Sequence, residues 1–292
     1  MNRRIVVGLD GSAESVAAAH WAAREALLRS APLHLVHAET WSPRPGVPAA
    51  RSEERRRAAR TLLREASDEL LDRHPRLDIS AESFDGQPAP SLARATAGAS
   101  MLVLGSRGLG TLRGFVLGSV GMAAIHAVEQ PVVLVRAAED ALPHDQGRHL
   151  DRGVVVGVDT GRPCDALLSF AFDEASRRGC TLHALHSWML PPLAGSGFAY
   201  NPEVNAQIAR TERTGLDDML RPWRDMYPAV DLDAQATVGP SSQQLLEAGS
   251  EAGLVVVGRR IRRSSVGMHI GPIAHAILHH STAPVAVIAH ES

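Results

Sequence analysis

The chain repeats itself once along its length, and this repetition constrains the fold more than any other feature. The segment RRIVVGLDGS at residues 3–12 returns as RGVVVGVDTG at residues 152–161, which is 149 positions later. The segment MLVLGSRG at residues 101–108 returns as LVVVGRRI at residues 254–261, which is 153 positions later. A repeat of this size in a chain of 292 residues predicts two similar domains.

The repeat also predicts where the domains lie. A polar linker at residues 139–151 separates the two copies. We therefore assign the first domain to residues 1–140 and the second domain to residues 150–292. The offset between the copies grows from 149 to 153. We expect the four extra residues of the second copy in a loop rich in Pro and Gly at residues 191–203.

Each copy alternates short apolar runs with longer segments of helical character. Residues 5–9 and 131–135 are rich in β-branched residues, which is typical of strands buried on both faces. Residues 77–84 alternate in polarity and predict a further strand. Residues 51–73 predict a long charged helix, and Ser12 is placed to cap the first helix. Strands separated by helices predict an α/β domain with a parallel sheet.

Composition excludes several classes of protein. The net charge is -2 and aromatic residues make up 4%, which argues against a nucleic-acid partner. An Arg-rich stretch at residues 54–60 is accompanied by acidic residues, so we interpret it as a solvated helix face. The chain contains no lysine, which excludes a P-loop lysine and Schiff-base chemistry. No run approaches the roughly 20 apolar residues of a membrane span, and we expect a cytoplasmic protein without membrane contact.

A pattern of glycines follows the fourth apolar run. Gly105 and Gly108 are separated by two residues, and Gly118 and Ser119 follow after nine more, at the start of a predicted helix. Glycines let the backbone turn tightly and let a phosphate approach closely. A helix start offers unpaired N–H groups and the positive end of the helix dipole. The pattern predicts a phosphate-binding loop, with glycines that only shape turns as the alternative.

This spacing and the segment VVGLDGS at residues 6–12 resemble the universal stress protein family in its tandem form. The ATP-binding signature of that family is Gly-x2-Gly-x9-Gly-Ser/Thr, and the first copy matches it at every position. The resemblance implies two tandem domains, each a five-stranded parallel sheet of order 3-2-1-4-5 with helices on both faces. It also implies ATP, with or without Mg²⁺, bound across the ends of the first and fourth strands.

The resemblance assigns roles to individual positions of the first copy. Asp10 would accept hydrogen bonds from ribose hydroxyls, and Ala38 would present backbone groups to the adenine. The other positions expected to contact ATP lie at the strand ends and around the glycine loop: Gly8, Leu104, Gly105, Gly108, Gly118, Ser119 and Val120.

The second copy departs from the family pattern. Gly258 and Gly271 are kept, but Ile261 replaces a glycine and Pro272 replaces the Ser. Pro272 removes a hydroxyl and a backbone N–H from the helix start. Asp159 is kept, so Asp159, Gly258 and Gly271 would form a weaker second site, and we expect one tightly bound ATP per chain. Nearby arginines expected on the loop could attract anions: Arg259, Arg260, Arg262 and Arg263.

These observations favour an ATP-binding stress-response sensor or regulatory protein. Its partners would be ATP and an unidentified protein. The sequence leaves open whether the chain forms a homodimer. No catalytic residue is indicated, because the glycine loop has neither a lysine nor an acidic residue tied to it. A weak ATPase, or another nucleotide-using enzyme on the same fold, is the alternative. A scaffold that binds no nucleotide is a third interpretation, and the intact first glycine pattern argues against it.

Two histidine patterns complete the sequence evidence. His275 and His279 lie four residues apart on a predicted helix, but no third ligand stands near them, so we expect no metal site. His37 and His186 recur at equivalent positions of the two copies. No nucleophile is paired with either by any motif, and a structural or pocket-edge role is the expectation.

Overall fold

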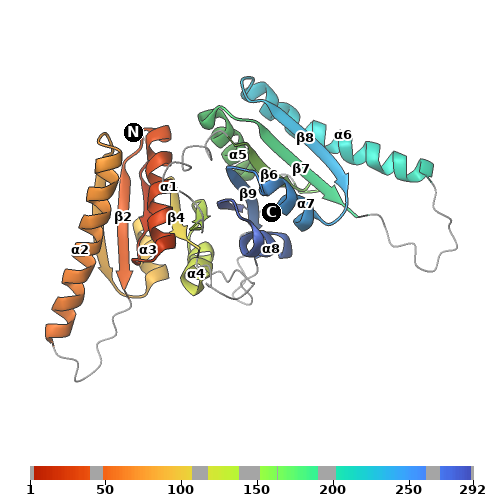
Figure 1. Cartoon of the computed structure of the whole chain (residues 1–292). Coiled ribbons are helices and arrows are strands. Elements are labelled where there is room, and N and C mark those ends of the chain that lie inside the picture. Colours follow the sequence, from red (N-terminus) through yellow and green to blue (C-terminus); the bar gives the residue numbers. More distant parts are fainter. Residues whose placement is uncertain are drawn as a thin grey trace. The chain divides into compact units, whose positions relative to one another are not determined.

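The computed structural model of the chain describes residues 3–39, 49–106, 118–137, 152–162, 164–189, 202–260 and 270–290. The chain divides into two compact units, Met1–Asp140 and Ala141–Ser292, which we call the first half and the second half (Figure 1). The predicted linker at residues 139–151 lies outside the described residues. Each half is described by itself.

The first half alternates strands with helices. Its strands are β1 (Ile5–Gly8), β2 (Leu33–Glu39), β3 (Ile79–Asp85), β4 (Met101–Gly105) and β5 (Val132–Val135). Its helices are α1 (Ala13–Arg29), α2 (Ala49–Arg73), α3 (Pro88–Thr96) and α4 (Ser119–Ala127). Ser12 is the N-cap of α1, as predicted, and its side chain accepts a hydrogen bond from the Ser15 N–H at 3.2 Å.

The second half repeats this order of elements. Its strands are β6 (Val154–Val158), β7 (Leu182–Trp188), β8 (Leu232–Val238), β9 (Leu254–Arg260) and β10 (Val285–His290). Its helices are α5 (Asp165–Arg178), α6 (Pro202–Met226), α7 (Ser241–Gly249) and α8 (Pro272–His280). Thirteen residues separate β7 from α6 and nine separate β2 from α2, so the four extra residues lie in the predicted loop region.

The strand order is the same in both halves and confirms the predicted fold class. The first half has the order β3-β2-β1-β4-β5, and the second half has the order β8-β7-β6-β9-β10. The pairs described within each half are all parallel. Consecutive residues of the central strands are buried, including Ile5–Val7 and Val154–Val156, so both faces of each sheet are covered.

The topology positions a crevice at the middle of each sheet. β1 pairs with β2 through Ile5 and Leu33, and it pairs with β4 through Ile5 and Met101. The chain therefore runs to one side of β1 and returns on the other side, so the strand order reverses between β1 and β4. The carboxyl ends of two strands that flank such a reversal form the usual ligand crevice of an open α/β sheet. β6 and β9 stand in the same relation in the second half.

The structure corrects two sequence expectations. The strand predicted at residues 77–84 spans Ile79–Asp85, and its residues are mostly exposed because it lies at the edge of the sheet and pairs with β2. Arg259 and Arg260, expected on a loop, belong to β9, and Arg259 is buried. β9 extends this far because β10 pairs with it up to Arg260 and His290.

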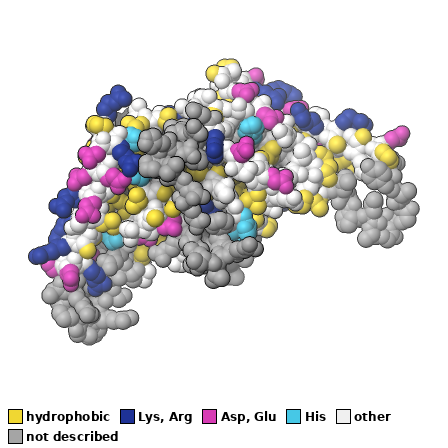
Figure 2. Space-filling view, viewed as in Figure 1, with side chains coloured by type: hydrophobic (Ala, Val, Ile, Leu, Met, Phe, Trp, Pro, Cys, Tyr) yellow, Lys and Arg dark blue, Asp and Glu magenta, His cyan; other side chains and the backbone are white. Residues whose placement is uncertain are grey.

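Charged side chains along α2 behave as a solvated helix face, as predicted. Arg57 and Arg60 both form ion pairs with Glu53, and Arg73 forms one with Glu69. Basic and acidic side chains are accordingly interspersed over this helix (Figure 2). Exposed pairs of this kind contribute about 0–1 kcal/mol each to stability. Among the described helices, none combines the length and the apolar character that crossing a membrane requires.

Candidate functional site

Asp10 lies at the carboxyl end of β1, in the position expected for it. Its Oδ1 accepts hydrogen bonds from the backbone N–H of Ser12 at 3.0 Å and from the Ser12 hydroxyl. Asp159 does the same after β6, where its Oδ1 accepts from the Gly161 N–H at 3.1 Å. Both side chains are exposed. Each half thus presents a carboxylate, fixed by a local turn, at the mouth of its crevice.

Gly8 and Gly105 have a packing role that the sequence did not reveal. A Cβ atom at Gly8 would stand 2.6 Å from Leu104 Cδ2, and Leu104 is itself buried. A Cβ atom at Gly105 would stand 2.6 Å from the backbone of Glu14 and Ser15, at the start of α1. These two glycines let β1, β4 and α1 approach one another closely. Their contact with a ligand stays a prediction, as it does for Leu104.

The start of α4 carries the end of the glycine pattern. Gly118 is the N-cap, at φ -61° and ψ 148°, and no side chain caps this helix end. The Met122 N–H donates to the Gly118 carbonyl at 3.0 Å, so the N–H groups of the three preceding helical residues have no acceptor within the helix. Ser119 and Val120 are exposed. Gly108 lies outside the described residues.

The repeated histidines shape the strand edge in both halves. His37 Nδ1 lies 2.8 Å from the Leu9 carbonyl oxygen, and His186 Nδ1 lies 3.2 Å from that of Val158. Because a carbonyl can only accept, Nδ1 carries the proton in both rings. Each imidazole therefore ties the second strand of its half to the residue just before the crevice carboxylate. Ala38, which follows His37 in β2, is half-buried.

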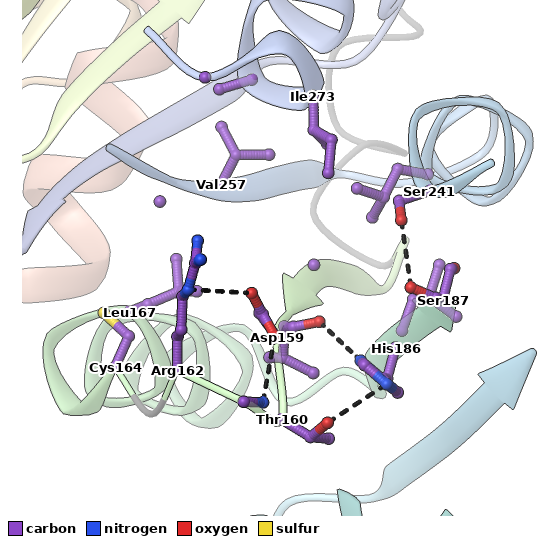
Figure 3. Close-up of a pocket in the computed structure, with 18 of the residues that line it drawn as sticks. Asp159, Thr160, Arg162, Cys164, Leu167, His186, Ser187, Ser241, Val257 and Ile273 are labelled. Carbon is purple, nitrogen blue, oxygen red and sulfur yellow. Dashed lines mark hydrogen bonds and ion pairs between the residues drawn. The ribbon is translucent and has the colours of Figure 1, made fainter. Parts of the chain in front are cut away.

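A cavity of about 1030 Å³ lies at the carboxyl ends of β6 and β9 in the second half (Figure 3). Asp159, Gly258 and Gly271, the three residues assigned to the weaker second site, line it together. Its wall also includes Thr160, His186, Trp188, Glu212 and Arg260. Its volume suits a ligand of mononucleotide size.

Three polar side chains meet at one wall of this cavity: His186 from β7, Glu212 from α6 and Thr160 from the turn after β6. His186 Nε2 lies 3.0 Å from Glu212 Oε2 and 3.3 Å from Thr160 Oγ1, and Thr160 Oγ1 lies 3.4 Å from Glu212 Oε2. Figure 3 shows the contact between His186 and Thr160. His186 already donates from Nδ1, so a hydrogen bond between Nε2 and Glu212 needs one further proton, on the imidazole or on the carboxyl group. We call these three residues the polar cluster.

At the positions matched by the repeat, the first half keeps the histidine of the polar cluster and not its other two polar residues. Gly11 stands where the second half has Thr160, and Ala59 stands where it has Glu212, at the repeat offsets of 149 and 153. Ala59 is buried. The histidine was predicted from its recurrence in the two copies, whereas Thr160 and Glu212 were not predicted. An alignment of the two copies could have indicated both residues, because each is a polar residue of the second copy that matches Gly or Ala in the first copy.

The phosphate end of the second-half cavity also differs from that of the first half. α8 begins with Pro272 after Gly271, and no side chain caps this helix end. The His275 N–H donates to the Gly271 carbonyl at 2.9 Å, so the start of α8 resembles that of α4 but has one N–H fewer. A Cβ atom at Gly258 would stand 2.9 Å from His290 Nε2. Ile261 lies outside the described residues.

Two other candidate groups can be placed in the second half. Cys164 lines the cavity, and burial raises the pKa of its thiol, which keeps it in the less reactive protonated form. The His275 and His279 rings lie 4.3 Å apart on α8. Within the described parts of the chain, no group of three or more His, Cys, Asp or Glu side chains is arranged to hold a metal ion.

The comparisons with known proteins agree with this architecture. The model of the universal stress protein family matches residues 1–136 and again residues 152–289. A solved universal stress protein from Archaeoglobus fulgidus superposes with a TM-score of 0.71 over 98% of each chain, at 18% identity. At that identity the likeness shows the fold.

Relatives of similar length are found among the mycobacteria. A universal stress protein of Mycolicibacterium smegmatis is 34% identical and covers 97% of this chain and 96% of its own length. A universal stress protein of Mycobacterium tuberculosis is 32% identical with the same coverage of both chains. The two family segments and these full-length matches show that the chain belongs to the universal stress protein family, with two such domains in tandem.

Proposed function

We propose that the chain binds ATP in its first half and acts in the cytoplasm as a nucleotide-responsive sensor or regulatory protein. One observation carries the proposal. The uncapped start of α4 completes the glycine signature of the family. The signature begins at the end of β4, next to β1, and Asp10 follows β1 in the chain. A crevice at a strand-order reversal is where open α/β sheets hold nucleotides.

The described residues fit the parts of ATP. The three N–H groups at the start of α4 and the Ser119 hydroxyl are donors for phosphate oxygens. The exposed carboxylate of Asp10 is an acceptor for ribose hydroxyls, and the backbone of Ala38 would face the adenine. Mg²⁺, if bound, would neutralise phosphate oxygens and needs no dedicated set of protein ligands.

We propose regulation by binding, with ATP hydrolysis slow or absent. Efficient hydrolysis needs a group that orients water and cations that stabilise the leaving phosphate. The chain has no lysine to perform the second task from the glycine loop. In this account a protein partner, still unidentified, responds to the ATP-bound state, and a homodimer is one way to present that state.

Replacing Gly118 with Val tests this function. The backbone angles of Gly118 suit any residue, so the fold should persist while the side chain occupies the space near the phosphates. We expect ATP affinity, measured by calorimetry, to fall at least about tenfold, or about 1.4 kcal/mol. The matched change Gly271→Val, where nothing lies within 4 Å of the added Cβ, should leave the tight ATP site unchanged. Equal ATP affinity in the parent chain and in Gly118→Val would refute the proposed site.

A further inference from the structure

The polar cluster converges on one nitrogen atom of His186. The Nδ1 atom of this ring donates to the Val158 carbonyl, and the Trp188 ring stacks on the imidazole with centroids 6.0 Å apart and planes 17° apart. These two contacts hold the ring in one orientation, with Nε2 close to Glu212 and Thr160. The cluster therefore presents a preoriented nitrogen atom whose lone pair faces two oxygen atoms.

The contact between His186 and Glu212 lacks a proton. Nε2 and Glu212 Oε2 lie 3.0 Å apart, and both are acceptors when the neutral ring carries its proton on Nδ1 and the carboxylate is ionised. The Thr160 hydroxyl lies 3.3 Å from Nε2 and 3.4 Å from Oε2, and its single proton can serve only one of them. A further positive group must therefore join the two acceptors, either a second proton or a cation.

The three atoms have the spacing of ligands around a zinc ion. Zn²⁺ binds imidazole nitrogen and carboxylate oxygen at about 2.0–2.1 Å in a tetrahedron, so its ligand atoms lie about 3.3–3.4 Å from one another. The three separations in the polar cluster are 3.0, 3.3 and 3.4 Å. A shared proton needs only two of these atoms, whereas a metal ion uses all three. An imidazole that donates its other N–H to a backbone carbonyl is also the usual form of a histidine ligand.

The packing of α6 holds the two oxygen atoms in place. Glu212 lies on this helix, which is anchored by the fully buried Leu216. A Cβ atom at Gly215 would stand 3.7 Å from Thr160 Cβ, so the same helix contacts the turn after β6. The Glu212 side chain is 30% exposed, and all three members of the polar cluster line the cavity. An ion can therefore enter from the cavity, and water can occupy the fourth position.

The first half shows that the fold itself does not require this arrangement. His37 has the same orientation as its counterpart in the polar cluster, because its Nδ1 also donates to a backbone carbonyl. Gly11 and Ala59 stand at the positions matched to the other two members, and neither has a side-chain oxygen. The second copy thus adds two oxygen ligands around a nitrogen that both copies keep.

We propose that His186, Glu212 and Thr160 bind a Zn²⁺ ion in the second half, with water in the fourth position toward the cavity. Imidazole is a good ligand for Zn²⁺, whereas Mg²⁺ and Ca²⁺ prefer oxygen ligands alone. Only two of the three ligands are His or Glu and the third is a neutral hydroxyl, so we expect a site that a chelator can empty. The proposal goes beyond the proposed function and does not depend on ATP binding.

A Zn²⁺ titration of the full chain, stripped of metal and free of nucleotide, tests the proposal. Competition with a chromophoric chelator gives the affinity. Glu212→Gln is the decisive variant, because the amide keeps the shape of the side chain and can itself donate to His186 Nε2. We expect the parent chain to bind one equivalent of Zn²⁺, with affinity at least about tenfold lower in Glu212→Gln. Equal affinity in the two chains would overturn the proposal and leave a proton as the link between His186 and Glu212.

Two control variants separate this site from a general attraction of cations. Asp225→Asn makes the same change of charge at an exposed position of α6 and should leave Zn²⁺ affinity unchanged. The double change His275→Gln and His279→Gln removes the neighbouring rings on α8, and the tightly bound equivalent should remain. A loss of affinity in either control as large as that in Glu212→Gln would contradict the assignment.

Cobalt gives a second readout, which reports the geometry of the site. Co²⁺ replaces Zn²⁺ in tetrahedral sites and then absorbs strongly in the visible range. We expect this absorption in the parent chain and not in Glu212→Gln, and identical spectra of the two chains would overturn the proposal. Thr160→Val keeps the shape of the side chain and removes the hydroxyl, so Zn²⁺ affinity should fall about threefold. Unchanged affinity in Thr160→Val would contradict a site of three protein ligands.

Discussion

The two halves of the chain share one sheet topology and differ where the strands end. In both halves an imidazole on the second strand donates to the backbone carbonyl before the crevice carboxylate. In the second half that imidazole also meets Thr160 and Glu212, whereas the matched residues of the first half are Gly11 and Ala59. The architecture tolerates divergence here because these residues follow the buried strands or lie on a helix outside the sheet.

The two domains keep one fold and differ in the groups that stand at the ends of their strands. The central strands of both halves are runs of buried Val, Ile and Leu, which specify the parallel sheet. The starts of α4 and α8 lie at equivalent places, yet Ser119 offers a hydroxyl and an N–H where Pro272 offers neither. The scaffold and the site are therefore encoded by different residues and can diverge separately.

The largest expected difference between the halves is in the core. Phe172 is buried against Trp223 and Tyr227, with ring centroids 5.9 Å and 5.5 Å away, and the first half has Ala23 at the matched position. Phe172→Ala should destabilise the second half by about 3–5 kcal/mol, because it removes the aromatic contacts and leaves a cavity. Hydrogen exchange followed by mass spectrometry should show the loss of protection in α5 and α6.

A conservative change on α6 serves as the control for that experiment. Val204 is 52% exposed, and Val204→Ala should change the stability of the second half by less than about 0.5 kcal/mol. A similar loss of protection in both halves after Phe172→Ala would show that the halves do not have separate cores.

An exchange of residues at the helix starts should move ATP affinity in opposite directions. Ser119→Pro takes a hydroxyl and an N–H from the start of α4, and we expect ATP affinity in the first half to fall by about 1–3 kcal/mol. Pro272→Ser restores both groups in the second half, and we expect a measurable gain in ATP affinity there. Calorimetry on both variants checks the pair. If the ATP affinity of the first half is the same in Ser119→Pro as in the parent chain, α4 does not contact the phosphates.

The smallest expected effect is an acid sensitivity of the first half. Burial lowers the pKa of His20 and of His34, and the hydrogen bond to Glu69 offsets this only in part for His20. Both rings are therefore neutral in the folded state when the unfolded chain begins to take up protons, near the ordinary pKa of about 6.5. The two neutral imidazoles therefore contribute fully to the free energy of unfolding above about pH 6.5, and this contribution is lost as the pH falls below that value.

Hydrogen exchange at pH 7 and at pH 5, corrected for intrinsic rates, measures this effect. Protection of α1 and β2 should decrease at the lower pH, and His20→Gln should remove part of the decrease. Protection of α1 that is equal at both values of pH in the parent chain would contradict the assignment.

Much of the fold could be predicted because it is encoded locally and twice. The apolar runs, the cap at Ser12 and the offsets of the repeat gave the strands, a helix start and the position of the four extra residues. Strand order came from the resemblance to the family and was confirmed. The prediction that Arg259 and Arg260 lie on a loop was wrong, because β9 pairs with β10 as far as Arg260. Pairing between segments that are distant in the sequence leaves no local pattern from which it could be predicted.

The candidate site was harder to predict for the same reason. Gly8 and Gly105 were assigned to ligand contact, but close packing against Leu104 and the start of α1 already requires them. Glu212 lies 26 residues after His186 in the sequence, and only the packing of α6 brings the two side chains together. Local patterns identify strand ends and helix starts, whereas the partners that converge on them depend on tertiary structure.

The number of ATP molecules bound per chain shows whether the two halves differ in their affinity for ATP. Native mass spectrometry of the full chain at increasing ATP concentration, supported by calorimetric stoichiometry, gives that number. We expect one tightly bound ATP per chain, with affinity at least about tenfold lower in Gly118→Val and unchanged in Gly271→Val. Two ATP molecules bound with similar affinity would contradict this expectation, because the second half would then hold phosphates despite Pro272.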